Sequence, residues 1–287
     1  MTNTELYLAF DIGGTTIKYS LITKDMTFLT HDVFPTPKTI LESISEICEE
    51  LIKVHHITAI GISTAGIVDS ERGSIRYASD LIPNYIGTPL KEHLEKKFSL
   101  PVNVINDVQA ALLGEALQNT LPDKTFCLTL GTGIGGAYFI NDQLYHGAND
   151  FENSIGYLNF DSTTGKTWEQ RASTISLEKK LKEKYDITVP EAFELARQNN
   201  KEMIFELRQW INEIAKGISS IILLFDPSLI LIGGGVSKQN DYIIPILEEE
   251  LEVLLPPNFL KTSFTTPSSF NQNALLGALY PYFITKN

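Results

Sequence analysis

A strand, a glycine turn and a second strand occur in the same order twice along this chain, once in each half. The first copy spans residues 6–23 and turns at Gly13, and the second spans residues 126–140 and turns at Gly133. In each copy a short apolar run precedes the turn and a strand pattern follows it. Because such a repeat indicates two related halves, the chain is predicted to fold as two α/β lobes. Its length of 287 residues agrees, since single cores stop growing at about 250 to 300 residues.

Elsewhere in the chain, apolar residues recur at both strand and helix spacing. Further strands are predicted at residues 26–34, 57–63, 102–106 and 229–232, and helices at residues 41–54, 108–117, 207–225 and from about 273. Asp226 and Pro227 are expected to end the long helix. We expect residues 1–117 to form a small N-terminal lobe, completed by a closing helix at 273–287. Residues 118–272 are expected to form a large C-terminal lobe.

The charge of the chain argues against nucleic acid as a partner. Its 23 Lys and Arg residues are outnumbered by 35 Asp and Glu residues, which gives a formal net charge of −12. The longest purely apolar run near the C-terminal half, residues 221–225, is far shorter than the roughly 20 residues of a membrane-spanning helix. The N-terminus lacks the basic and apolar regions of a secretory signal, so a cytoplasmic location is expected. Cys48 and Cys127 are interpreted as small buried hydrophobic residues.

The two glycine turns are candidate anion sites. Backbone N–H groups in such turns can form an anion-binding concavity, and the hydroxyls of Thr15, Thr16 and Thr132 add donors. The alternative interpretation is that both are tight structural turns that bind no ligand. The duplication of the turn argues against this alternative. Residues 131–136 also satisfy G-x-G-x-x-G, but a strand pattern follows where a dinucleotide site needs a helix.

Asn106 and Asp107 come at the end of a predicted strand, directly before a predicted helix. In α/β proteins this is where functional side chains are exposed at a cleft. Asp107 has two interpretations: a helix N-cap, or a base that accepts a proton from a substrate hydroxyl. Asp11, beside the first glycine turn, is a second candidate carboxylate. Residues 61–65 approach the G-x-S-x-G nucleophile elbow, but the last glycine is displaced to position 66 and no histidine lies in a triad context.

Five segments in order resemble the ROK family of sugar kinases and repressors over nearly the whole chain. They are FDIGGTTIK at 10–18, GISTAGIVD at 61–69, NDVQAALLGEAL at 106–117, LTLGTGIGGA at 128–137 and LIGGG at 231–235. The resemblance implies the two-lobed actin/hexokinase-like ATPase fold, built from duplicated ribonuclease H-like domains. It also implies ATP, Mg²⁺ and a sugar bound in the cleft between the lobes, and a homodimer.

The resemblance assigns roles to residues at the matching positions. Those implied to bind ATP phosphates, Mg²⁺ or adenosine are Asp11, Gly13, Gly14, Thr15, Thr16, Lys18, Gly131, Thr132, Gly133, Gly135, Gly233, Gly234 and Gly235. Those implied to contact the sugar are Gly66, Asn84, Asn106, Asp107, Ser154, Tyr157 and Glu169. Asp107 matches the family's catalytic base, which accepts the proton of the sugar 6-hydroxyl as it attacks the γ-phosphate.

The chain departs from the family pattern in two places. Most members carry one histidine and three cysteines just before the glutamate that Glu169 matches, whereas residues 161–168 contain no cysteine, so no structural zinc is expected. Ser154 and Tyr157 stand where the family has a glutamate and a histidine. A serine cannot accept two sugar hydroxyls as a carboxylate can, so either nearby Glu152 compensates or sugar affinity is reduced.

Within the family, the segments 61–88 and 168–172 are most similar to the zinc-free N-acetylmannosamine kinases of Gram-positive bacteria, which implies a place in sialic acid catabolism. Glucose and β-glucosides are the competing substrates, because a few pocket contacts decide specificity. A sugar-responsive repressor is a second class, but only about five residues precede the first strand, where a DNA-binding domain is needed. A non-catalytic sugar sensor is a third, suggested only by Ser154.

Overall fold

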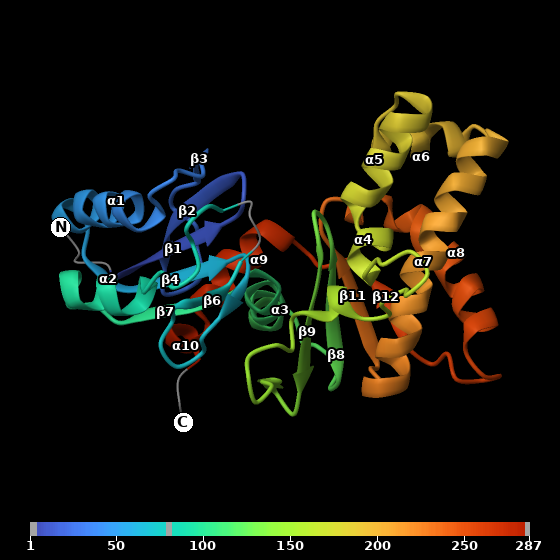
Figure 1. Cartoon of the computed structure of the whole chain (residues 1–287). Helices are drawn as coiled ribbons and strands as arrows, with labels where there is room; N and C mark the ends of the chain where they lie inside the picture. The colour runs from blue at the N-terminus through green and yellow to red at the C-terminus, as the bar shows by residue number, and fades with distance from the viewer. Residues whose placement is uncertain (1–4, 79–81, 285–287) are drawn as a thin grey trace. The chain divides into compact units, whose positions relative to one another are not determined.

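The computed structural model describes residues 5–78 and 82–284 of the chain. Residues 1–4, within the expected first lobe, residues 79–81, and residues 285–287 of the expected closing helix lie outside this description. The chain divides into two compact units (Figure 1). The first contains Met1–Leu121, His146–Asn153 and Ser268–Asn287, and the second contains Pro122–Tyr145 and Ser154–Pro267.

The first unit is built on a five-stranded mixed sheet in the order β3-β2-β1-β4-β7. Its strands are β1 (Leu6–Ile12), β2 (Thr16–Thr23), β3 (Asp32–Pro35), β4 (Ile57–Thr64) and β7 (Val102–Asn106). The first three strands are antiparallel neighbours, whereas β1, β4 and β7 run parallel. A small ribbon of β5 (Ile67–Val68) and β6 (Ile75–Tyr77) follows β4.

Helices cover both faces of this sheet because alternate residues of β1 point to opposite sides. Leu8 and Phe10 pack in a core with α1 (Ile40–Val54) and α2 (Leu90–Phe98), while Tyr7 and Ala9 pack against α9 (Phe270–Ala278). The short helix α10 (Tyr280–Phe283) follows α9. The chain therefore returns at its end to the unit in which it begins.

Glycines let α9 approach α3 (Asp107–Gln118) backbone to backbone. A Cβ on Gly277 would lie 1.7 Å from the carbonyl oxygen of Ala110, and a Cβ on Gly114 would lie 2.0 Å from that of Asn273. No larger residue fits at either position without moving the helices apart. This close contact fixes α3, the helix that begins at Asp107.

The second unit repeats the strand order of the first. Its sheet has the order β10-β9-β8-β11-β12, with β8 (Thr125–Leu130), β9 (Ile134–Ile140), β10 (Gln143–Leu144), β11 (Leu229–Gly233) and β12 (Ser263–Thr265). Again the first three are antiparallel neighbours, and β8, β11 and β12 run parallel. The prediction of a duplicated α/β fold is confirmed.

The helices of the second unit enclose one large core. They are α4 (Trp168–Ala172), α5 (Thr174–Tyr185), α6 (Val189–Arg197), α7 (Lys201–Phe225) and α8 (Asn240–Leu254), with single 3₁₀ turns η1 (Ile155–Tyr157) and η2 (Ser237–Gln239). Asn200 caps α7, which begins six residues earlier than predicted, and Asp226 ends it in the left-handed conformation, as expected for this turn. None of the helices in the described ranges is long and apolar enough to cross a membrane.

Some element predictions were wrong. The strand expected at residues 26–34 is confined to Asp32–Pro35, because Thr23 and Asp25 hold the preceding residues in a hydrogen-bonded turn. The helices α2, α4, α5, α6 and α8 were not predicted. At α6 a signal was present, since Thr188 and Glu191 form a capping box at its start.

Candidate active site

Parallel pairing brings three functional segments of the first unit to one edge of its sheet. The carboxyl ends of β1, β4 and β7 carry Asp11, Ser63 and Asn106. Asp11 pairs in register with Ser63, and Thr64 pairs with Asn106. Because the ends of parallel strands coincide, residues about 50 and 95 positions apart in sequence become neighbours.

Asp11 is held by one donor on each carboxylate oxygen. Ser63 donates to Oδ1 over 2.9 Å, and the Lys18 ammonium lies 3.4 Å from Oδ2. Burial raises the pKa of Asp11, while Lys18 and Ser63 oppose this shift. Sequence reasoning considered Ser63 only within the segment 61–65 and did not identify it as a partner of Asp11, because the register that joins them is set by the pairing of β1 and β4. Ser63 lies within strand β4, which agrees with the rejection of a nucleophile elbow from the sequence, because that elbow requires a strand-to-helix turn.

Asp107 is the first residue of α3, and the N-cap of this helix is Asn106. The alternative that Asp107 serves as the cap is therefore wrong. Oδ1 of Asp107 accepts hydrogen bonds from the Asn106 side chain and the Val108 N–H, both over 2.9 Å. Burial, followed by the nearby Asp11 carboxylate, raises the pKa of Asp107 to about 7. A carboxyl group with this pKa exchanges protons near neutral pH, as a general base must.

Gly66 lies close to this helix start. Its carbonyl oxygen accepts hydrogen bonds from the side chains of Asn106, over 2.9 Å, and Asn153, over 3.3 Å. Its φ of 101° and the 2.5 Å at which an added Cβ would meet the Tyr77 carbonyl oxygen restrict the position to glycine. Asn153 was not among the residues selected from the sequence.

Asn84 sits in an exposed loop of the same unit, with a left-handed φ of 57°. The next residue, Tyr85, is buried, and its hydroxyl lies 2.7 Å from the hydroxyl of Thr64 at the end of β4. This contact anchors the loop to the sheet edge that carries Asp11 and Asn106.

In the second unit, the glycine turn between β8 and β9 meets Glu169. Oε2 of Glu169 accepts the N–H of Ile134 over 3.2 Å. A Cβ on Gly133 would lie 2.8 Å from this oxygen, and one on Gly156 would lie 2.7 Å from it, so both glycines make room for the carboxylate. Thr132, at the tip of the turn, is exposed. The strand after the turn is β9, which confirms that this is not a dinucleotide-binding turn.

The Gly233 to Gly235 segment lies beside the same turn. Gly233 pairs in register with Thr129, and a Cβ on Gly234 would meet the Leu130 oxygen at 2.2 Å. Ser154 precedes the 3₁₀ turn that contains Tyr157, and the Tyr157 side chain is exposed. The second unit thus gathers the turn, the glycine triplet and Glu169.

The segment where a zinc cluster was considered is a small polar loop. Asp161 pairs with Lys166 across it and accepts hydrogen bonds from Thr163, over 2.9 Å, and Thr164, over 2.6 Å. Arg171 on α4 donates to the carbonyl oxygens of Lys166 and Asn159, over 2.8 and 2.9 Å. In the ranges that the structure describes, no three His, Cys, Asp or Glu side chains group as metal ligands would.

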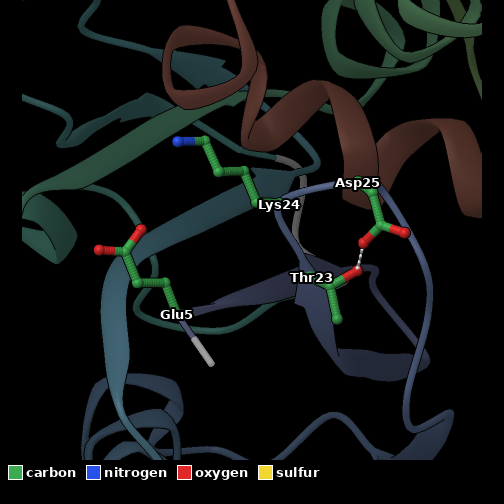
Figure 2. A pocket seen from close by; sticks show the side chains of 4 residues that line it. All are labelled: Glu5, Thr23, Lys24 and Asp25. Carbon is green, nitrogen blue, oxygen red and sulfur yellow. Dashed lines mark hydrogen bonds between the residues drawn. The ribbon is translucent and has the colours of Figure 1, made fainter. Parts of the chain in front are cut away.

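A shallow pocket elsewhere in the first unit is separate from these residues. Figure 2 shows its lining by Glu5, Thr23, Lys24 and Asp25, in which Thr23 donates a hydrogen bond to Asp25. It lies where β1 begins and β2 ends, whereas Asp11 lies where β1 ends. The pocket is therefore at the opposite end of the strand from the candidate active site.

A duplicated α/β fold with a carboxylate at the end of a central parallel strand in its first half defines the actin/hexokinase-like ATPase class. The ROK family model matches residues 7–282, and the chain belongs to the ROK family.

Three relatives illustrate the match. A Listeria monocytogenes protein described as a candidate N-acetylmannosamine kinase has a TM-score of 0.85 at 27% identity, covering 96% of this chain and 97% of that one. A ROK family glucokinase from Streptomyces griseus, in complex with glucose and AMPPNP, has a TM-score of 0.79 at 25% identity, covering 95% and 97%. A β-glucoside kinase of Listeria monocytogenes is 29% identical, covering 97% and 98%.

Proposed function

We propose that this chain is an ATP-dependent sugar kinase with Asp107 as its catalytic base. The observation that carries the proposal is the Asp107 carboxyl group, which lies at the start of α3 with a pKa raised to about 7. A structural cap would not need this group, because Asn106 already caps the helix. The assignment therefore explains a half-buried carboxylate with a raised pKa that helix capping leaves unexplained.

In the proposed reaction the sugar 6-hydroxyl attacks the γ-phosphorus of ATP. The new bond joins the sugar oxygen to phosphorus, the bond from phosphorus to the β,γ-bridging oxygen breaks, and ADP leaves with that electron pair. Asp107 accepts the hydroxyl proton. Positioning and electrostatics provide most of the rate enhancement in phosphoryl transfer, so a held carboxylate is the main chemical contribution required of this unit.

We propose that the glycine turns hold the nucleotide. The first turn, with Thr15 and Thr16, and the turn at 131–136 would donate to phosphate oxygens, and the segment 233–235 would line the adenosine. Mg²⁺ bound to the phosphates would neutralise their charge. Asp11 fits that ion, because it is a carboxylate at a strand end and Mg²⁺ is commonly held by one or two carboxylates together with substrate phosphates.

For the substrate, we propose an N-acetylhexosamine, N-acetylmannosamine in particular, and with it a role in sialic acid catabolism. The similarity to the Listeria protein supports this choice. Glucokinase or β-glucoside kinase activity is the second candidate, supported by the relatives with those names. Glu169, Asn84, Ser154 and Tyr157 are proposed sugar contacts. The homodimer that the family resemblance implies belongs to the same proposal and can be checked by light scattering.

A coupled ADP-release assay tests the proposal. N-acetylmannosamine, N-acetylglucosamine, glucose and cellobiose would each be offered with MgATP to the wild type and to Asp107→Asn. We expect the highest kcat/KM with N-acetylmannosamine, and a loss of about 10²- to 10⁴-fold in kcat for Asp107→Asn. If no sugar stimulates ADP release by the wild type, the kinase proposal fails, and a non-catalytic sugar sensor becomes the better interpretation.

The Ser154→Glu variant tests the departure from the family pattern. If position 154 contacts the sugar, restoring a carboxylate is expected to lower the KM for the sugar while leaving the KM for ATP unchanged. An unchanged KM for every sugar would show that position 154 is not a sugar contact.

A further inference from the structure

We infer that residues 146–153 form a strap fastened to the first unit at two places, and that the contact between His146 and Glu152 is a fastening whose strength depends on pH. The strap is reached from the second unit and leads back into it, since Pro122–Tyr145 and Ser154–Pro267 both belong to that unit. The strap itself packs with the first unit. How firmly it is held there does not depend on the proposed kinase reaction.

The first fastening is made by Arg76 of β6. A guanidinium nitrogen lies 3.0 Å from Oδ2 of Asp69 and 3.4 Å from Oδ2 of Asp150 on the strap. Another donates to the carbonyl oxygen of Asn149, also on the strap, over 3.5 Å. An arginine side chain stays protonated at every pH at which proteins are folded. This fastening is therefore expected to hold equally well at acid and alkaline pH.

The second fastening is the carboxylate of Glu152, whose side chain is only 6% exposed. Oε1 accepts a hydrogen bond from the side chain of Gln109 on α3 over 2.8 Å, and it lies 3.2 Å from Nδ1 of His146. The strap closes on itself here, since a Cβ on Gly147 would lie 3.1 Å from Oε2. Both ends of the strap thus meet at one buried carboxylate, which is held to the first turn of α3.

The groups around this carboxylate make His146 its titratable partner. The hydrogen bond with Glu152, followed by the charges of Glu152 and Asp150, raises the pKa of His146 against the opposing effect of burial. Burial also opposes the ionisation of Glu152, but His146 and nearby backbone N–H groups hold the pKa of Glu152 below its ordinary value. From α3 the pair meets the neutral Gln109, and from β6 Arg76 compensates Asp150.

Deprotonation of His146 should loosen the strap. A neutral imidazole can still donate a hydrogen bond, but it no longer compensates the buried charge of Glu152, and an uncompensated buried carboxylate is costly. Because the pKa of His146 is raised while the strap is fastened, the stabilisation is present below the ordinary histidine pKa of about 6.5. It is lost as the pH rises through the raised pKa.

Titration of the histidines tests the pairing. In protein with ¹³C-labelled histidine, the Cε1–Hε1 resonance of His146 is the one missing from His146→Gln, and it is titrated in the wild type and in Glu152→Gln. Glutamine keeps an oxygen that can accept from Gln109 but removes the charge, so the pKa of His146 should fall toward the ordinary value of about 6.5. His55, exposed at the end of α1, is the internal control and should titrate identically in both proteins.

A nitroxide on Phe151→Cys reports the strap directly by electron paramagnetic resonance. Phe151 is exposed, and the native Cys48 and Cys127 are buried, so the label attaches at one place. Between pH 5.5 and 8.5 we expect the ratio of mobile to immobile label to rise by roughly threefold to tenfold, with its midpoint at the pKa of His146. His146→Gln in the labelled chain should remove this pH dependence. Arg76→Met should increase the mobile component at both ends of the pH range.

A label on Phe259→Cys, which is similarly exposed on the second unit, is the control and should not respond to pH. A pKa of His146 that is the same in the wild type and in Glu152→Gln would overturn the inference. A label at position 151 with the same mobility at pH 5.5 and 8.5 would do so too, as would an unchanged pH response in His146→Gln. Should Glu152→Gln fail to fold, the comparison with His146→Gln decides, because the His146 side chain is half-exposed.

Discussion

Lys18 and Asp11 face each other as a register pair of β1 and β2, with the ammonium nitrogen 3.4 Å from the carboxylate oxygen Oδ2. The pairing places a positive charge beside a carboxylate at the strand end where Asp107 also lies. The charge of Asp11 contributes to the raised pKa of Asp107, and Lys18 lowers the pKa of Asp11. One ion pair therefore influences both carboxylates of the proposed reaction.

Replacing Lys18 with methionine should weaken nucleotide binding. Lys18 brings a positive charge close to the first glycine turn, where the phosphates of ATP are proposed to bind, so without the ammonium group we expect the KM for ATP to rise about tenfold, equivalent to about 1.4 kcal/mol. Initial rates against ATP concentration measure this. Lys24→Met is the control, because Lys24 lines the pocket at the other end of the sheet (Figure 2). Equal KM values for the two variants would contradict the prediction.

The pH dependence of kcat/KM should report Asp107. The base works only when ionised, and its pKa is raised to about 7, so activity is expected to fall about tenfold per pH unit below 7 and to level off above it. Rates measured from pH 5.5 to 8.5 check this dependence. A rate that is flat through pH 7 would exclude Asp107 as the base.

The same raised pKa predicts that folding is less favoured as pH rises from about 4 to 7, since the folded chain binds the proton more tightly than the unfolded chain.

Gly217→Ala should destabilise the second unit, although alanine normally favours a helix. A Cβ at Gly217 on α7 would lie 1.9 Å from the ring of the buried Trp168, the first residue of α4. We expect a loss of about 2 kcal/mol in the free energy of unfolding, together with a raised KM for the sugar, because α4 also carries Glu169. Ser219→Ala on the same helix is the control and should change stability by less than about 0.5 kcal/mol. Urea denaturation measures the free energy of unfolding of both variants. A Gly217→Ala variant as stable as the wild type would show that α4 can shift away from α7 without loss of stability.

Glu206 should stabilise the second unit at neutral pH and lose this effect in acid. It is buried among Lys180, Lys184 and Tyr185, and although burial opposes ionisation, hydrogen bonds from these three groups lower its pKa to about 2. Because the folded pKa is lowered, the stabilisation is present above about pH 4.5 and is lost as pH falls toward 2. Glu206→Gln should cost about 1–3 kcal/mol at pH 7. If the difference in the free energy of unfolding between the wild type and Glu206→Gln does not become smaller as the pH falls, the ion pairs of Glu206 are not the cause of that difference.

Chelation should leave the protein intact. The loop at residues 161–166 is closed by hydrogen bonds to Asp161 and by Arg171, groups that need no metal ion. We expect no stoichiometric zinc by elemental analysis of the purified protein, and the same Tm with and without EDTA. Stoichiometric zinc, or a Tm lowered by EDTA, would refute this account of the loop.

Local pattern was sufficient for the glycine turns and for the long central strands of each sheet, but not for β3 or for the short strands β5, β6, β10 and β12. Residues 102–106 were predicted to within a residue, because alternating apolar positions at a buried strand are a strong local signal. The helices α5 and α8 gave weaker signals, since their lysine-rich or glutamate-rich surfaces obscure a narrow apolar face. Their stability comes from packing in the core of the second unit, which no short window of sequence contains.

The sequence by itself determined the duplicated α/β order, the two glycine turns and the position of Asp107 between a strand and a helix, because each depends on residues close together in the chain. Only the tertiary structure decided which residue caps α3 and which side chains form hydrogen bonds with Asp11 and Gly66. Asn106 proved to be the cap of α3, and Ser63 and Asn153 became partners of Asp11 and Gly66. These contacts join residues about 50 and 90 positions apart: the first exists because parallel strands end at a common edge, and the second because the loop that carries Asn153 packs against the turn after β4.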